Sequence, residues 1–246
     1  MRTILAIIAC IELFLVAALG WVAVVLVYLA TFWFDKRRIL SGRTLRRTAQ
    51  AAVLFSPLWR FRIHGEVPKN PGKAVCISNH CSHTDVFLIA HVPWEMKWLA
   101  KRSLFNMPFV GWSMRLVEDV PIDRASPSAA KVALDKCAEW LSRGVPVMIF
   151  PEGTRSKTGE MQAFKDGAFR LAIETGADVL PMAVAGTESA LSKHDWRPGQ
   201  ARGILTIGKP ISTAGMTQKD VPQLKEAARA QIAALRAQIL PLTSAS

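Results

Sequence analysis

The chain has 246 residues, half of them hydrophobic, and its 31 lysines and arginines against 19 acidic residues give a formal charge of +12. This length allows one domain or at most two. So strong a positive balance implies an anionic partner: nucleic acid, an anionic membrane surface or a phosphorylated substrate. The four cysteines form no CxxC pair, which excludes a disulfide framework and fits a reducing compartment.

The N-terminal segment from Ile4 to Phe34 is apolar, interrupted only by Glu12 and a few mildly polar or small residues. As one helix it would be about 46 Å long, against about 30 Å of hydrocarbon in a bilayer. We therefore predict a retained membrane anchor that spans with tilt or runs on into the interface. The triplet Ala18-Leu19-Gly20 could be a signal-peptide cleavage site, but the apolar run continues well past the length of a signal sequence.

Basic residues follow this anchor, with six lysines and arginines among the thirteen residues 35–47. They predict that the C-terminal side of the anchor lies in the cytoplasm, against anionic headgroups. Residues 44–61 then mix apolar side chains with arginines, which indicates either an interfacial amphipathic helix, broken or bent near Pro57, or a buried core helix. We assign residues 1–60 to a membrane anchor with an interfacial helix, and residues 61–246 to a second, globular domain.

From Phe61 onward, short apolar strands alternate with amphipathic helices. Strands are predicted at residues 74–78, 97–100, 145–150, 179–184 and 203–207, and helices at 126–143, 165–175 and about 222–240. Ser126 suits the N-cap of the first of these helices, with Pro127 at its first position and Gly144 after its end. This alternation predicts an α/β domain whose mixed or largely parallel sheet is flanked by helices.

The first segment with chemical potential is Ser78–Asp85, between a buried strand and an apolar helix. Here Asp85 can fold back to accept the second N–H of His80, which fixes the imidazole tautomer and stabilises the imidazolium. Such a pair activates an external hydroxyl without a serine nucleophile. The alternative is a zinc site.

That alternative would use His80, His83, Cys76 and Cys81, but the sequence offers no second ligand pair at standard spacing. The other candidate ligands, His91 and His194, are isolated. We therefore expect no metal.

The second segment is Phe150–Ser156, again directly after an apolar strand. Its Gly-Thr-Arg-Ser turn offers backbone N–H groups, hydroxyls and a guanidinium, which suit a phosphate, although a purely structural turn is also possible. Glu152 could orient Arg155 or meet the hydroxyls of a substrate. Two further segments are Val120–Arg124, which ends just before a predicted helix, and 179–184, where Pro181 requires an edge or a bulge.

Together and in this order, the four segments resemble the glycerolipid acyltransferase family over roughly residues 63–209. The resemblance implies that His80 is a general base with Asp85 as its partner, and that Arg124 and Arg155 lie near the phosphate of the acceptor. It also implies that Glu152, Gly153, Thr154 and Lys101 belong to the substrate site. Pro121 departs from the Phe or Leu that is frequent in the family, which leaves the acceptor less certain than the reaction.

The resemblance thus implies transfer of a fatty acyl group from acyl-carrier protein or coenzyme A to a lysophospholipid. The foremost acceptor is 1-acyl-glycerol-3-phosphate, giving phosphatidic acid on the cytoplasmic face of a membrane, with no cofactor. The rivals are a metal-dependent hydrolase and a membrane-tethered basic module that binds nucleic acid or lipid without catalysis. The second rival gives no reason for the pairing of His80 with Asp85, and the basic residues lack the interleaved aromatics that single-strand binding favours.

Overall fold

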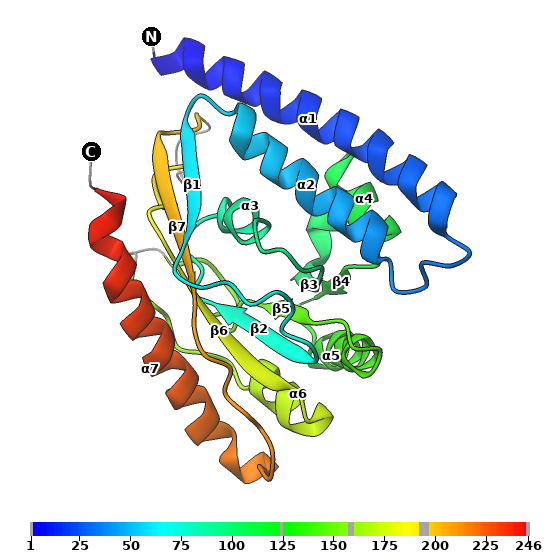
Figure 1. Cartoon of the computed structure of the whole chain (residues 1–246), viewed down its shortest axis with the longest axis vertical. Coiled ribbons are helices and arrows are strands. Elements are labelled where there is room, and N and C mark those ends of the chain that lie inside the picture. Colours follow the sequence, from blue (N-terminus) through cyan, green and yellow to red (C-terminus); the bar gives the residue numbers. More distant parts are fainter. Residues whose placement is uncertain (1, 124, 157–159, 192–196, 245–246) are drawn as a thin grey trace.

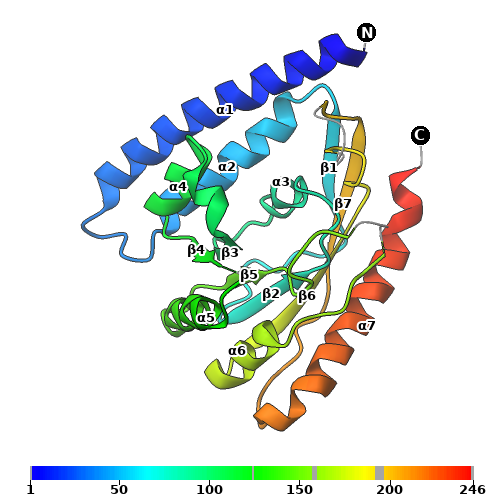
Figure 2. The same cartoon turned by 180° about the vertical axis from the view of Figure 1, so that it is seen from behind.

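The computed structural model of the chain describes residues 2–123, 125–156, 160–191 and 197–244. Within these residues a seven-stranded sheet lies between two layers of helices (Figures 1 and 2). In spatial order its strands are β1 (Trp59–His64), β7 (Ala201–Ile207), β6 (Asp178–Ala185), β2 (Ala74–Ser78), β5 (Val147–Ile149), β3 (Lys97–Lys101) and β4 (Val120–Ile122). Neighbouring strands are parallel, except that β6 and β7 run antiparallel. The predicted α/β class with a mixed, largely parallel sheet is confirmed.

Both faces of the sheet are buried, as helices on both sides of a parallel sheet require. On β2, Val75 and Ile77 join one apolar core, and Ala74 and Cys76 join the other. The first core is closed by α5 (Pro127–Ser142), α6 (Gly167–Thr175) and α7 (Val221–Ile239). The other face carries α1 (Arg2–Thr31), α2 (Ile39–Phe55), α3 (Asp85–Ile89) and α4 (Val110–Leu116) (Figure 1). Short 3-10 helices are η1 (Arg102–Asn106), η2 (Gln218–Asp220) and η3 (Leu240–Thr243).

Local signals in the sequence correctly mark the start of α5 and the end of α6. The Ser126 hydroxyl accepts a hydrogen bond from the N–H of Ala129 at 3.3 Å, and Pro127 opens α5. Gly176 ends α6 in the left-handed conformation, with φ 62°. The start of α6 is two residues later than predicted, at Gly167.

The helix predicted over residues 44–61 is wrong at both ends. It begins earlier, at Ile39, and it ends at Phe55 because Ser56, the residue before Pro57, adopts an extended conformation. The residues beyond Pro57 form β1, where Trp59 is 1% exposed. Of the two predicted effects of Pro57, a break or a bend, the structure has the break: the helix ends before Pro57 and a strand follows it.

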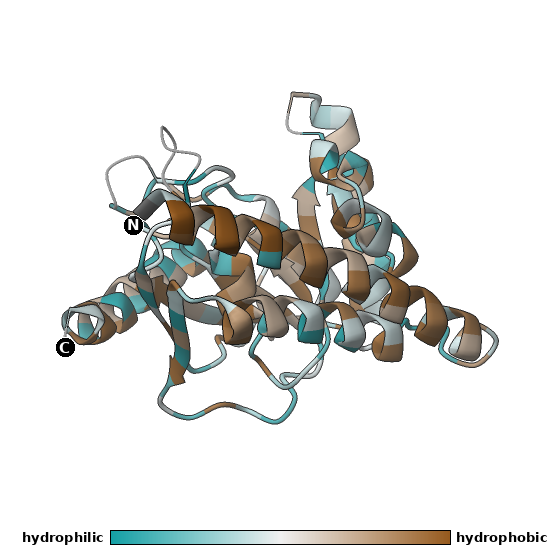
Figure 3. Cartoon of the chain, turned by 90° about the horizontal axis from the view of Figure 1, so that it is seen from above, coloured by the Kyte–Doolittle hydropathy of each residue, from teal (hydrophilic) through white to brown (hydrophobic). Residues whose placement is uncertain are grey.

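The long helix α1 passes the length and composition test for crossing a membrane. It packs along α2, and its Gly20 permits this contact: a Cβ there would lie 2.1 Å from the Thr48 Cγ2 atom. Ala9 and Val24 are buried and several apolar side chains are half-buried, but many large ones, such as Phe14 and Leu19, are exposed. Figure 3 shows hydrophobic residues along most of the length of α1. The helix is thus attached to the domain along its length and presents an uncovered apolar side.

Pro181 lies in β6, an interior strand, where a missing N–H needs an explanation. Val179 pairs with Ile211, and regular pairing resumes at Met182 with Ile207. Between these two pairs, residues 208–210 oppose residues 180–181. The segment after β7 therefore has one extra residue and forms a bulge beside Pro181. The expectation that this proline requires an edge or a bulge is met by the bulge.

Candidate active site

The strand order brings the predicted motifs to one edge of the sheet. Strands β2, β5, β3 and β4 are adjacent and parallel, so their carboxyl ends point the same way. His80 follows β2, the Pro151–Ser156 turn follows β5, Lys101 ends β3 and Asp123 follows β4. Neighbouring strands are about 4.8 Å apart, so His80 and Lys101 start from strands about 10 Å apart. Arg124 lies outside the described residues.

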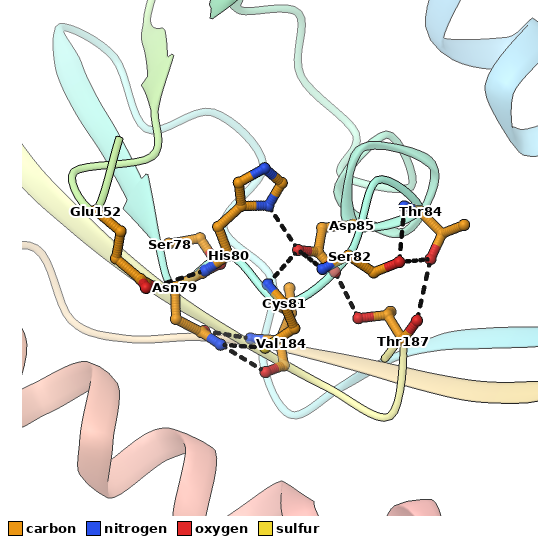
Figure 4. A network of polar contacts seen from close by, with 10 residues as sticks. All are labelled: Ser78, Asn79, His80, Cys81, Ser82, Thr84, Asp85, Glu152, Val184 and Thr187. Carbon is orange, nitrogen blue, oxygen red and sulfur yellow. Dashed lines mark hydrogen bonds and ion pairs between the residues drawn. The ribbon is translucent and has the colours of Figure 1, made fainter. Parts of the chain in front are cut away.

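The centre of the site is the pair of His80 and Asp85 (Figure 4). His80 Nδ1 lies 2.8 Å from Asp85 Oδ2. The same carboxylate oxygen accepts the backbone N–H groups of Cys81 at 2.7 Å and Ser82 at 2.9 Å. Asp85 is fully buried at the first turn of α3. Since a carboxylate with these N–H donors is held as an acceptor, Nδ1 carries the proton and Nε2 presents its lone pair.

The ring of His80 is fixed in place and still accessible. It stacks on Phe150, with 4.0 Å between ring centroids and 16° between planes. The His80 side chain is 11% exposed. Within the described part of the chain, Nδ1 carries the only hydrogen bond of the ring. Nε2 is therefore able to take a proton from a bound molecule.

Glu152 joins the two motif loops through the backbone. Its Oε1 accepts the N–H of His80 at 2.8 Å, and its Oε2 accepts the N–H of Gln162 at 3.0 Å. Burial raises the pKa of the Glu152 carboxyl, and these two N–H donors oppose the rise. The carboxylate therefore supports the His80 loop, a role that the sequence did not reveal.

The Pro151–Ser156 turn brings its arginine close to the dyad. The N–H of Ser156 donates to the His80 carbonyl at 2.8 Å. Partial burial lowers the pKa of His83, and the nearby Arg155 guanidinium and His80 lower it further. In the same turn Thr154 is exposed, and Gly153 lies against the Lys165 side chain, whose Nζ would be 3.1 Å from a Cβ at that glycine.

Lys101 lies at a cavity of about 440 Å³ at the carboxyl ends of β3 and β4. The cavity is lined by Lys101, Arg102, Ser103, Asn106, Ile122, Asp123 and Ala125. Lys101 and Arg102 are both exposed, and Asp123 is the acidic residue of this lining. The cavity therefore carries a net positive charge and suits an anionic group.

The arrangement does not assemble the zinc site that the sequence raised. Among the described residues, no three His, Cys, Asp or Glu side chains are grouped to hold a metal ion. Burial raises the pKa of Cys76 to about 12, so this thiol is a poor ligand. Burial also raises the pKa of Cys81. His194 lies outside the described residues.

Two functional contacts were missed by the sequence analysis. The Asn79 amide accepts the N–H of Val184 and donates to the Val184 carbonyl, both at 2.9 Å, which extends the pairing of β2 with β6 beyond Ser78. The Thr187 hydroxyl donates to Asp85 Oδ1 at 2.5 Å. The direct succession of Asn79 and His80 after a buried strand was a usable signal for the first contact. The sequence carried no such signal for the second contact, because Thr187 lies 102 residues from Asp85.

Comparison with known proteins gives consistent results. A family model described as Acyltransferase matches residues 60–185. A 1-acyl-sn-glycerol-3-phosphate acyltransferase of Pseudomonas aeruginosa is 31% identical over 186 residues, which cover 74% of this chain and 71% of that protein. The crystal structure of the 1-acyl-sn-glycerophosphate acyltransferase of Thermotoga maritima superposes with a TM-score of 0.76 at 25% identity, covering 96% of this chain and 98% of that one.

Plant and algal relatives of the same description are longer. A chloroplastic protein of Arabidopsis thaliana is 34% identical over 160 residues, which are 64% of this chain and 43% of the relative. One from Chlamydomonas reinhardtii is 33% identical over 205 residues, which are 81% of this chain and 60% of the relative. The chain thus spans about half the length of these curated relatives.

Proposed function

The chain belongs to the acyltransferase family, and on that premise we propose that it moves a fatty acyl group from a thioester to the free hydroxyl of a lysophospholipid. The proposed acceptor is 1-acyl-glycerol-3-phosphate, and the product is phosphatidic acid. The observation that carries the proposal is the His80–Asp85 pair, whose Nε2 is free to accept a proton; a basic cavity lies at the same edge of the sheet, two strands away.

In the proposed reaction His80 is the general base. Nε2 takes the proton of the acceptor hydroxyl while that oxygen bonds to the thioester carbonyl carbon, and Asp85 stabilises the imidazolium. When the carbon–sulfur bond breaks, a thiol of pKa about 8.5 leaves readily as a thiolate, and His80 can return the proton to it. No covalent intermediate on the protein is needed.

The phosphate of the acceptor is assigned to the basic residues around this edge of the sheet. Arg155 and His80 both lie close enough to His83 to lower its pKa. Lys101 lies two strands away from β2. Guanidinium groups suit a phosphate because they offer paired donors. Arg124 follows Asp123 at the cavity in sequence, and we assign it to the same phosphate; Gly153 and Thr154 contribute the turn beside it.

Residues 1–60 are proposed to hold the site at the membrane. α1 and α2 pack side by side, and α2 exposes Arg43 and Arg47. If α1 crossed the bilayer, these charges would enter hydrocarbon at a cost of several kcal/mol. We therefore propose that the pair lies in one interface, with the apolar side of α1 in the lipid and the basic residues at anionic headgroups. The proposed face is the cytoplasmic one.

The function is tested by direct assay of the purified full chain in lipid vesicles. An acyl-CoA and an acyl-carrier protein are each offered with 1-acyl-glycerol-3-phosphate or with monoacylglycerol, and products are identified by mass spectrometry. Phosphatidic acid is expected from at least one donor, without loss of rate in a chelator. Release of free fatty acid alone, or loss of activity on chelation, would favour a hydrolase. Absence of turnover with every donor and acceptor would favour the binding module.

A further inference from the structure

The two oxygens of the Asp85 carboxylate have different partners. Oδ2 accepts three N–H groups, from the ring of His80 and from the backbone of Cys81 and Ser82. Oδ1 accepts the hydroxyl of Thr187 at 2.5 Å. Figure 4 shows these contacts, and both Asp85 and Thr187 are fully buried. Because no water reaches this oxygen, its stabilisation depends on the protein group beside it.

The fold holds Thr187 firmly in this place. It follows β6 after Gly186, which turns the chain with φ 79°; a Cβ at Gly186 would lie 2.0 Å from the Arg202 carbonyl oxygen. The Thr187 methyl packs against Gly203 of β7, where a Cβ would lie 3.0 Å from it. The Thr187 carbonyl accepts the N–H of Ala190 at 3.1 Å. Backbone and methyl are both fixed, so the hydroxyl has one direction in which to donate.

We propose that Thr187 is a positioning residue for acyl transfer, which acts through Asp85 and does not touch the substrate. This inference rests on the proposed function. Thr187 lies two residues beyond the segment that the family model matches, 60–185. The Thr187 hydroxyl extends the His80–Asp85 pair to three hydrogen-bonded side chains.

The physical reason is the charge that develops on His80. When Nε2 accepts a proton, the imidazolium is stabilised only while Asp85 remains an anion in the correct orientation. A hydroxyl that donates to the second oxygen favours the anion and prevents rotation of the carboxylate. Removal of that donor leaves Asp85 Oδ1 buried without a hydrogen-bond partner. The free-energy cost is largest in the transition state, where the carboxylate must face the His80 imidazolium.

The test uses Thr187→Val, which keeps shape and removes the hydroxyl, and Thr187→Ser, which keeps the hydroxyl. Thr213→Val is the matched control, because Thr213 is also buried and donates to a backbone carbonyl, that of Ala177, at 3.0 Å. We expect Thr187→Val to lower kcat about ten- to a hundredfold with KM unchanged, and Thr187→Ser to restore most of it. Thr213→Val should lower Tm but keep kcat.

A second readout does not depend on turnover. In protein labelled with 15N-histidine, the Nδ1–H resonance of His80 should shift or vanish in Thr187→Val and stay unchanged in Thr213→Val. In an Asp85→Ala background, Thr187→Val should have no further effect on the residual rate. Unchanged kcat together with an unchanged resonance in Thr187→Val would overturn the inference. A wild-type protein without acyl transfer would refute the proposed function, and the resonance would still decide the role of Thr187.

Discussion

Two polar clusters on the same sheet differ in which of their atoms lack a hydrogen-bond partner. Around His80 and Asp85, both carboxylate oxygens are satisfied by protein donors, and the free atom is Nε2 at the surface. Beneath α2, Arg46 donates to both oxygens of Asp119, at 2.8 and 3.0 Å, and lies 3.4 Å from Glu95. Here the atoms without a hydrogen-bond partner, Arg46 Nε and Glu95 Oε2, are buried.

The comparison shows that burial of charge alone does not mark an active site. The Arg46 cluster joins α2 to the segments before β3 and β4, and Arg46 also stacks on Trp98 with its guanidinium 5.2 Å from the ring centroid. It holds α2, and with it α1, on the domain. The dyad points one uncommitted atom outward, toward a place that a substrate can occupy. We therefore expect changes in the dyad to alter rate, and changes in the Arg46 cluster to alter stability.

The largest effect is expected for the base itself. His80→Ala should lower kcat by roughly 10²- to 10⁴-fold, because general-base catalysis contributes about that much. The protein should still fold, with a modest fall in Tm, because the 11%-exposed ring stacks on Phe150 and hydrogen-bonds to the buried Asp85. Asp85→Asn should be severely impaired as well. His83→Ala is the control and should be much milder. Equal damage from His83→Ala and His80→Ala, measured by steady-state kinetics, would revive the metal interpretation.

Arg46→Met should destabilise the protein by about 3–5 kcal/mol, because it leaves Glu95 and Asp119 as buried charges without their partner. Urea unfolding in detergent micelles measures this loss. The neighbouring exposed arginine provides the control: Arg47→Met should change the free energy of unfolding by no more than about 0.5 kcal/mol. Similar losses in both variants would mean that the cluster does not fasten α2.

Glu95 should make stability depend on pH. Burial raises its pKa from 4.5 to about 7, although Arg46 and Lys97 oppose the rise. Between these values the unfolded chain releases the proton and the folded chain retains it, so stability falls as pH rises through this window and is level above it. Glu95→Gln should reduce this fall in the free energy of unfolding by up to about 3 kcal/mol. Parallel unfolding curves for wild type and variant at pH 5 and pH 7 would contradict this assignment.

Removal of the Arg155 side chain should weaken recognition of the acceptor. Because a hydrogen bond to a charged group contributes about 1.5–3 kcal/mol, Arg155→Ala should lower kcat/KM for 1-acyl-glycerol-3-phosphate by roughly ten- to a hundredfold. Monoacylglycerol, which lacks the phosphate, should lose far less. Arg170, exposed on α6, gives the control variant Arg170→Ala. Equal losses for both acceptors would assign Arg155 a structural role in the turn.

The sequence predicted the parts of this molecule that depend on neighbouring residues. The N-cap Ser126 and the C-terminal Gly176 were recognisable because their partners lie within a turn. The pairing of His80 with Asp85 spans only five residues and was also predicted. Parallel strands place their carboxyl ends together, which is why the motifs that each follow a strand meet at one edge.

What the sequence did not reveal depends on distant partners. Glu152 meets the His80 backbone across 72 residues, and Arg46 meets Asp119 across 73. A polar residue carries no local mark of such a contact. The extended conformation of Trp59–Phe61 was missed for a similar reason, since that segment pairs with β7 from the far end of the chain. Arg46 was consequently assigned to a basic surface, whereas its side chain is 13% exposed and lies inside a charge cluster.

Direct attack by the acceptor hydroxyl is the central claim, and it is tested most directly by measuring the mass of the protein during turnover. The purified full chain is mixed with an acyl thioester, with or without 1-acyl-glycerol-3-phosphate, quenched within one turnover and examined by intact-mass spectrometry. We predict unchanged protein mass in both mixtures, and phosphatidic acid only when the acceptor is present. An acylated protein that accumulates with the donor alone and then transfers its acyl group to the acceptor would contradict the account.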